Sequence, residues 1–380
     1  MVPRARAMVR PGVRGRNALA CLRGEDGAAA TGCRPGNPVR DAVLWPLAFV
    51  LVPELSLPAG LTARPMRADD MAAAADLLAA AEVVDDTGEH ESAEGLADWW
   101  VNDLVDLTRD SLLVQTPDGE VVALAAVVAP PTFRDAFTVY LEGCVHPDRR
   151  GRGIGRALLA WQLARGAQVH AERHPEAPAR LTVSVFATMG TAEALVRHAG
   201  LTPQRWFSQM ARPLTGLPAT PAVPGVRLVP FTFDRDDEVR RAHNAAFSGH
   251  YGSSERDAAS WQVLFTGQRS FRPDLSVLAI EDGAVLGYVL AYVSEATTEA
   301  TGDRETYLGQ IGVLPHARGR GIAKATITEA LRLAAGHDCQ VAALQVDSEN
   351  GSGAVGLYEG LGFVTQRTRV SWVRDVSPPA

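Results

Sequence analysis

The strongest constraint on the fold is an internal repeat. The run Arg-Gly-Arg-Gly-Ile begins at Arg150 and again at Arg318, 168 positions later. A second matching pair of runs, Gly60–Met66 and Gly225–Phe231, opens each copy at an offset of 165. This period is too long for a solenoid unit and has the size of a whole domain. The sequence therefore predicts two tandem domains of the same fold.

Two segments lie outside the repeated part. Residues 1–57 are rich in Arg, Gly and Pro and show no sustained periodicity, which predicts a disordered leader. Residues 214–224 (LTGLPATPAVP) carry no charge and three prolines, which is typical of a semi-stiff linker. We therefore expect an N-terminal domain over 58–213 and a C-terminal domain over 225–380.

The composition excludes several classes of protein. Hydrophobic residues make up 46% and charged residues 21% of the chain, as in an ordinary globular protein, and the net charge of -7 argues against nucleic acid as a main ligand. The longest apolar run, 42–52, contains Pro46 and is too short to span a bilayer, so we expect no membrane partner. The four cysteines are scattered without a CxxC pair, which favours a reducing cytoplasm and no metal centre.

Both halves show the same order of expected elements, a mixed α/β (α+β) pattern. Each sheet should be largely antiparallel, twisted and flanked by helices, with a final pair of strands. Asp69 and Asp236 are the expected helix caps. In the first half we expect strands over 61–66, 111–115, 121–128, 138–145 and 181–186, and helices over 69–82, 94–107 and 154–172. In the second half we expect strands over 226–231, 275–280, 285–293, 307–313 and 340–346, and helices over 236–247, 257–265 and 322–335.

The repeated glycine runs predict a phosphate-binding loop in each half. Each lies between an expected strand and an expected helix, where glycines allow a tight turn and the helix N-terminus attracts anions. A dinucleotide-binding loop is disfavoured because the run follows the fourth strand, and a P-loop because no Gly-Lys-Ser/Thr follows. A purely structural turn remains the alternative. The candidate binding residues are Arg150, Gly151, Arg152, Gly153, Ile154 and Gly155, and Arg318, Gly319, Arg320, Gly321, Ile322 and Ala323.

The second half carries a further motif after its glycine loop. Asn350 is followed by Ala354-Val-Gly-Leu-Tyr358-Glu-Gly-Leu-Gly-Phe363. Together with the loop, this stretch resembles the GCN5-related N-acetyltransferases (GNATs), whose motif has one residue fewer between Asn and Ala. The resemblance covers about residues 60–375 as two domains and implies the GNAT fold and an acyl-CoA co-substrate. The first half matches well only at its loop.

The resemblance implies roles for individual residues. The amides of the loops would hold the acyl-CoA pyrophosphate, and the backbone near Val313 together with Asn350 would bind the pantetheine arm. Tyr358 would protonate the leaving thiolate as general acid after direct attack by an amine. In the first half Val196 stands at the position of Tyr358, and Thr188 is about opposite Asn350. We therefore expect a catalytic C-terminal domain and an N-terminal domain that binds acyl-CoA weakly or structurally without turnover.

These inferences predict an enzyme that moves acetyl from acetyl-CoA to the primary amine of a small molecule, without a metal. The tandem arrangement is similar to that of mycothiol synthases, which implies a cysteinyl-sugar amine as one alternative acceptor. A non-catalytic acyl-CoA sensor is the alternative from another class.

The general base is left open by the sequence. The aligned strand positions hold Glu142 in the first half and Gln310 in the second, and an amide cannot take a proton. The substitutes considered are Glu305, Tyr307, Glu295, His250 and Glu255.

Three other signals favour plain structural roles. His170 and His174 have the spacing of zinc ligands on a helix, but a solvated helix end is favoured because no third ligand is evident. The acidic stretch from Asp85 to Glu91, together with the acids up to Asp110, is expected to be a solvated face, with attraction of a cationic amine as the alternative. The corresponding segment of the second half, 243–252 with Trp261 and Phe265, is aromatic and His-rich; Trp261 is expected in the core, with the lining of an uncharged or mixed acceptor site as the alternative.

Overall fold

The computed structural model describes residues 55–102, 104–250, 252–349 and 353–376. The predicted leader over 1–57 therefore lies almost wholly outside the described residues, and so does Asn350. No helix in the described ranges is both long and apolar enough to cross a bilayer.

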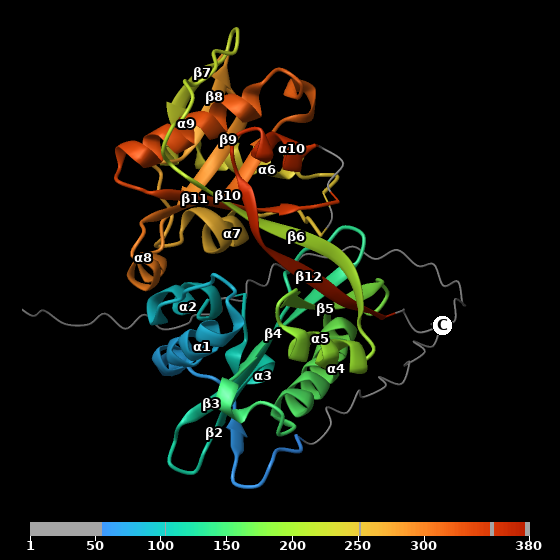
Figure 1. Cartoon of the computed structure of the whole chain (residues 1–380). Helices are drawn as coiled ribbons and strands as arrows, with labels where there is room; N and C mark the ends of the chain where they lie inside the picture. Colours follow the sequence, from blue (N-terminus) through green and yellow to red (C-terminus); the bar gives the residue numbers. More distant parts are fainter. Residues whose placement is uncertain (1–54, 103, 251, 350–352, 377–380) are drawn as a thin grey trace, which may run out of the picture. The chain divides into compact units, whose positions relative to one another are not determined.

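The two halves repeat one order of elements (Figure 1). The first half contains β1 (Thr62–Arg64), α1 (Met71–Asp85), α2 (Ala93–Trp100), α3 (Leu107–Asp110), β2 (Ser111–Gln115), β3 (Val121–Val128), β4 (Phe137–Val145), α4 (Ile154–Arg173), β5 (Ala179–Phe186), α5 (Gly190–His198) and β6 (Thr202–Pro213). The second half contains β7 (Arg227–Pro230), α6 (Asp236–Ala246), α7 (Ala258–Trp261), β8 (Val277–Glu281), β9 (Ala284–Tyr292), α8 (Glu295–Thr301), β10 (Glu305–Val313), α9 (Ile322–Gly336), β11 (Val341–Asp347), α10 (Ala354–Glu359) and β12 (Val364–Val376). A π-helical turn over Gln262–Thr266 follows α7 directly.

The mixed α/β class with a largely antiparallel sheet is confirmed. The described strands form one sheet in the order β1-β2-β3-β4-β5-β12-β6-β11-β10-β9-β8-β7. The pairs β4–β5 and β10–β11 are parallel, and the other neighbouring pairs are antiparallel.

The last strand of each half crosses into the other half's side of the sheet. β12 pairs with β5 of the first half, and β6 pairs with β11 of the second. Instead of the expected final pair of strands, each half ends in one long strand, and the two long strands pair with each other at the centre of Figure 1. The described residues consequently belong to one compact unit.

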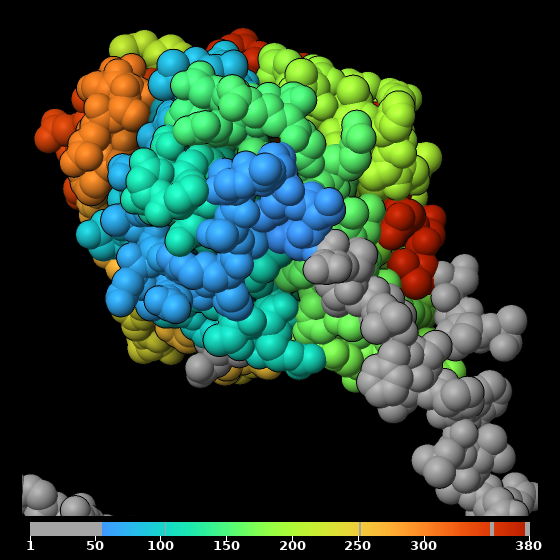
Figure 2. Space-filling model, turned by 90° about the horizontal axis from the view of Figure 1, so that it is seen from below, coloured from blue at the N-terminus to red at the C-terminus, as the bar shows by residue number. Residues whose placement is uncertain are grey.

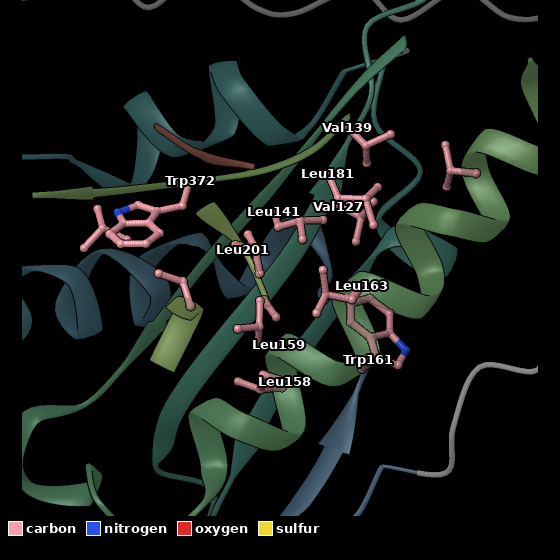
Figure 3. Close-up of a cluster of buried hydrophobic side chains, with 14 of the residues drawn as sticks. Val127, Val139, Leu141, Leu158, Leu159, Trp161, Leu163, Leu181, Leu201 and Trp372 are labelled. Atoms are coloured by element: carbon pink, nitrogen blue, oxygen red, sulfur yellow. The ribbon is translucent and has the colours of Figure 1, made fainter. Parts of the chain in front are cut away.

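The exchange places side chains of one half in the core of the other. Trp372 of β12 is buried among first-half residues, as Figure 3 shows beside Leu141 and Leu201. Met210 of β6 is likewise buried in the second-half core with Leu344. Since apolar burial is the main source of stability, each half is completed by the other.

Two predicted helix caps are wrong. Asp69 lies within a 3-10 turn before α1, and the α1 N-cap is Asp70, whose side chain accepts no capping bond. Asp236 is the first residue of α6, and its buried carboxylate accepts a hydrogen bond from Trp261 Nε1 at 2.6 Å instead of capping the helix. Trp261 is buried, as predicted. An aspartate near a helix start can accept hydrogen bonds from several different donors, and the sequence alone does not show which donor lies within reach.

His170 also differs from the expectation of a solvated helix end. Its side chain is buried, and Nε2 lies 2.7 Å from the carbonyl oxygen of Ala177, while His174 packs against Phe137. The pair closes the end of α4 against the following turn.

Candidate active site

Both glycine loops have the backbone that the sequence predicts. Gly319 and Gly321 have φ of 78° and 84°, and Gly151 and Gly153 have φ of 73° and 92°. This left-handed region favours glycine over any residue with a Cβ. A Cβ at any of these four positions would meet nothing within 4 Å, so both loops present an open face.

The loops lead directly into helices α4 and α9. Gly153 and Gly321 are the N-caps, and neither helix start has a side-chain cap. The first backbone N–H groups of a helix have no partner within the helix, and its dipole is positive at that end. Each loop is therefore suited to hold an anionic group such as a pyrophosphate.

The arginines that open the loops anchor them to the first long helix of each half. Each of these arginines donates through Nε to the last carbonyl of the preceding strand. The distance is 3.0 Å from Arg150 to Val145 O and 3.3 Å from Arg318 to Val313 O. Arg150 also donates to Asp85 at 2.6 and 2.7 Å, and Arg318 Nη2 donates to Ala246 O at 2.8 Å.

The next arginine differs between the halves. Both side chains are exposed, but only Arg320 has a carboxylate partner among the described residues: it donates to Glu281 at 2.5 and 2.9 Å. The hydrogen bond from Arg320 holds the pKa of the Glu281 carboxyl below its usual range. Arg320 thus ties the second loop to β8 from outside.

A gap opens in the sheet beside each loop. β10 pairs with β11 only over Glu305–Tyr307, although both strands continue beyond this segment. The other side of β10 stays paired with β9 as far as Val313. Residues 308–313 of β10 therefore have an unpaired strand edge toward β11, which is what an extended ligand arm needs for β-type hydrogen bonds.

Tyr358 lies on α10, which follows β11, and belongs to the same core cluster as Leu344 and Val346 of that strand. Its side chain is buried, with its ring centroid 6.1 Å from that of Phe363. Burial, with a smaller effect from Tyr307, raises the pKa of Tyr358 to about 12. The hydroxyl is therefore protonated at neutral pH and able to donate a proton.

Val196 is the structural counterpart of Tyr358. The carbonyl of Val196 accepts from Leu201 N–H at 3.1 Å, and the carbonyl of Tyr358 accepts from Phe363 N–H at 3.0 Å. Gly200 and Gly362, which precede the two donors, have φ of 82° and 87°. The same turn therefore carries a hydroxyl in the second half and an aliphatic side chain in the first.

A cavity of about 940 Å³ lies against the sheet of the second half. Its walls come from both halves of the chain. Figure 2 shows on the molecular surface that first-half residues, in blue and cyan, lie beside second-half residues, in orange. The first half contributes residues 88–99 around the start of α2, and the second half contributes the π-helical turn, α8 and parts of β9, β10, β11 and β12.

The acidic stretch of the first half forms one wall of this cavity. Glu91 lines it, and burial together with Glu89 and Asp98 raises the pKa of Glu91 to about 7. Glu89 itself pairs with Arg369 of β12, and Asp98 accepts from Arg269 Nε at 2.9 Å. Glu89 and Asp98 therefore form ion pairs with arginines of the second half. The sequence predicts a solvated face for this stretch instead.

The base candidates are separated by the fold. Glu305, Tyr307 and Glu295 line the cavity, while His250 and Glu255 are not among its lining residues. Burial raises the pKa of Glu305, and Arg367 opposes the shift. Glu305 is thus a carboxylate of raised basicity on the same strand as the gap.

Glu142 and Gln310 are equivalent, as aligned. Glu142 faces Ala126 in the β3–β4 ladder, and Gln310 faces Leu290 in the β9–β10 ladder, each three residues before the end of its strand. The Glu142 side chain is exposed, but desolvation by the surrounding protein and the nearby Glu89 raise its pKa, with Arg369 opposing the shift.

Tyr292 is a cavity residue that sequence reasoning missed. Its ring packs against the β-bulge at Gly309, where an added Cβ would lie 2.7 Å from Cε2, and its buried hydroxyl has no hydrogen-bond partner among the described residues. Strand β9 is apolar apart from its two tyrosines, Tyr288 and Tyr292, and its sequence does not show which of them lines a cavity.

Comparison with known proteins agrees with this geometry. The family model for the acetyltransferase (GNAT) family matches residues 76–180 and 237–363. The chain is 32% identical over 272 residues to the mycothiol acetyltransferase of Frankia casuarinae, covering 69% of this chain and 73% of that protein. It is 35% identical over 246 residues to the mycothiol acetyltransferase of Mycolicibacterium vanbaalenii, covering 61% and 73%. A GCN5-related N-acetyltransferase structure from Sphaerobacter thermophilus matches with a TM-score of 0.68 and 27% identity over 86% of this chain and 98% of that one.

The chain belongs to the GNAT family of acyl-CoA-dependent N-acetyltransferases. The predicted family, the tandem GNAT fold and the assignment as an acyltransferase are confirmed.

Proposed function

We propose that the second half transfers an acetyl group from acetyl-CoA to the primary amine of a small molecule, and that the first half is non-catalytic. The observation that carries this proposal is the difference between Tyr358 and Val196 at equivalent turns. Among the described residues, the second half has a hydroxyl at this turn, and residues within 305–310 of its strand β10 line the large cavity, although Tyr358 itself is not among the lining residues.

Acetyl-CoA would lie across the gap between β10 and β11. The amides at the start of α9, from Gly319 to Ala323, hold the pyrophosphate, and the free edge of β10 near Val313 pairs with the pantetheine arm. Asn350 would bind the same arm. The first loop, Arg150–Gly155, offers an equivalent cradle, in which acyl-CoA would serve a structural purpose.

The reaction is a direct displacement. The neutral amine nitrogen attacks the thioester carbonyl carbon, the C–S bond breaks, and the nitrogen loses a proton to Glu305 through water. The departing CoA thiolate takes the Tyr358 proton, and the phenolate is reprotonated from solvent. Since the pKa of Tyr358 is about 12, the acid is present throughout the neutral pH range.

The cavity favours an acceptor with both polar and cationic groups. Glu91, Glu295 and Glu305 line it together with Arg367 and the unpaired hydroxyl of Tyr292. Because several relatives are named mycothiol acetyltransferases, a cysteinyl-sugar amine is the second candidate acceptor. The acceptor would be met in the cytoplasm, as the scattered cysteines predict.

The binding half of the proposal is tested by titrating acetyl-CoA into the intact chain by calorimetry. Gly321→Glu places a carboxylate in the second cradle and should lower affinity at least ~100-fold through charge repulsion and lost space. Gly321→Ala is the matched control, because it has the same left-handed backbone strain without the carboxylate. If Gly321→Glu binds acetyl-CoA as tightly as the wild type, the second loop does not hold the pyrophosphate, and acetyl-CoA binds at the first loop or elsewhere.

The acceptor is tested by measuring thiol release with a panel of primary amines, including a cysteinyl-sugar amine. We expect at least one amine to raise thiol release above hydrolysis. Acetyl-CoA binding without release for any amine would favour the sensor alternative.

A further inference from the structure

The first half contains a counterpart of the large cavity. Tyr307 and Tyr140 are the last residues of β10 and β4 that pair with the following parallel strand, at Ala343 and Thr182. Tyr307 lines the cavity of about 940 Å³. Tyr140 lines a cavity of only about 20 Å³. The two positions are equivalent in the sheet but differ greatly in the space beside them.

A segment of the second half closes the smaller cavity. Residues Gly252–Arg256 form one wall, and Thr132 Oγ1 of the first half donates to Glu255 O at 2.8 Å. The backbone of Arg256 is fixed from the second half: its N–H donates to Asn244 Oδ1 at 2.9 Å, and its carbonyl accepts from Arg240 Nη1 at 2.8 Å. The segment is therefore held from both sides.

The side chain of Arg256 has buried donor atoms without partners in the described part of the chain. Its Nε and Nη1 atoms are buried and have no hydrogen-bond partner among the described residues. Leaving buried charged donors unpaired is unfavourable, because the hydrogen bonds they made to water are lost without replacement. Burial accordingly lowers the pKa of Arg256, with Tyr140 and Asp257 opposing the shift.

The other charges around the cavity do not cancel this guanidinium. Arg134 and Arg180 line the same cavity, and Asp135 is the single acid among its lining residues. Asp375, which does not line the cavity, forms an ion pair with Arg180 at 3.8 Å. With Asp375 included, three arginines meet two carboxylates here, so one positive charge and the two unpaired donors of Arg256 remain among the described residues.

We propose that this cavity binds one small monovalent anion of the size of chloride, which accepts hydrogen bonds from Nε and Nη1 of Arg256. A volume of about 20 Å³ exceeds the ~10–15 Å³ that one water needs and suits a monatomic ion better than phosphate or sulfate. A water would pair with the donors but leave the excess charge uncompensated.

The anion would hold the two halves together. It lies between β4 and Arg180 of the first half and the Gly252–Arg256 segment of the second. By occupying the place that corresponds to the large cavity, the ion and its segment keep the first half closed to an acceptor. This role is independent of the activity proposed for the second half.

The test compares thermal unfolding of the full chain in sodium chloride and in sodium gluconate at equal ionic strength. We expect the wild-type Tm to rise saturably with chloride, by about 2 °C or more, because a ligand that binds only the folded state stabilises it. Arg256→Met should lose this response, whereas Arg227→Met, which removes an exposed arginine of β7, should keep it.

A crystal grown in bromide provides the second measurement, which needs no variant. We expect an anomalous peak within hydrogen-bond distance of Arg256 Nε and Nη1. Equal wild-type Tm values in both salts, or a site that holds only water in bromide, would overturn the proposal.

Discussion

At the scale of residues, the proposal of a single catalytic half depends on the difference between Tyr358 and Val196. Val196 and Tyr358 occupy the same hydrogen-bonded turn, and this difference could be predicted from the sequence because the turn, Gly and following apolar residue recur in both halves. The partner of Tyr358 in proton transfer could not be predicted. The aligned Gln310 is no base, and the basicity of Glu305 depends on burial by distant segments.

Glu305→Gln tests the proton acceptor. The change keeps size and hydrogen bonding but removes the base, so kcat/KM should fall about 10²–10⁴-fold. In the wild type, activity requires the ionised carboxylate and is lost as the pH falls through its pKa. Since burial raises that pKa, the acid limb should lie at higher pH than for an ordinary glutamate.

The pH profile of kcat/KM distinguishes this role from a structural one. Glu299→Gln, at an exposed position on α8 in the same cavity, is the matched control and should keep both rate and acid limb. If Glu305→Gln retains the wild-type acid limb, another group or water alone accepts the proton.

At the scale of elements, the loops and hairpins were predicted well and the last strands were not. The glycine loops, both hairpins and the helices after the loops rest on local patterns, such as left-handed glycines and alternating apolar residues. The neighbours of β6 and β12 depend on pairing between residues more than a hundred positions apart. Their alternating pattern is the same for either neighbour, so the sequence predicts strands there but not the exchange.

Trp372→Ala tests the contribution of the exchanged strand β12. The indole is buried in the first-half core, and its removal leaves a cavity, so the free energy of unfolding should fall by about 3–5 kcal/mol. Trp99→Ala, at a position 43% exposed, should cost about 0.5 kcal/mol or less. Urea unfolding followed by circular dichroism measures both. Equal small effects would mean that β12 adds little to the first half.

At the scale of the whole molecule, the two halves share both their cores and the candidate acceptor cavity. The wall formed by residues 88–99 belongs to the first half, whereas the walls formed by α8 and β10 belong to the second. In the proposed function, a first half without turnover would therefore still shape the acceptor site. The tandem repeat predicted two copies of one fold, but no local pattern indicated that the cavity takes residues from both.

Separate production of residues 55–213 and 225–376 tests this interdependence. Each piece would expose an apolar strand and lack a strand of its own sheet, so each should be poorly folded or aggregated alone. Mixing and refolding the two should restore a 1:1 complex with acetyltransferase activity, as followed by size-exclusion chromatography. The intact chain cleaved within 214–224 after folding is the control and should stay assembled. Two monomeric, cooperatively unfolding pieces would contradict the account.

The central claim is that Tyr358 is the acid of a single catalytic half. The most direct measurement is the rate of thiol release by the full-length Tyr358→Phe variant, with acetyl-CoA affinity measured on the same sample and Tyr292→Phe as a matched hydroxyl deletion at the cavity. We predict a fall in kcat of about 10²–10⁴-fold with unchanged acetyl-CoA affinity in Tyr358→Phe. Turnover near the wild-type rate in that variant, with acetyl-CoA still bound, would contradict the assignment.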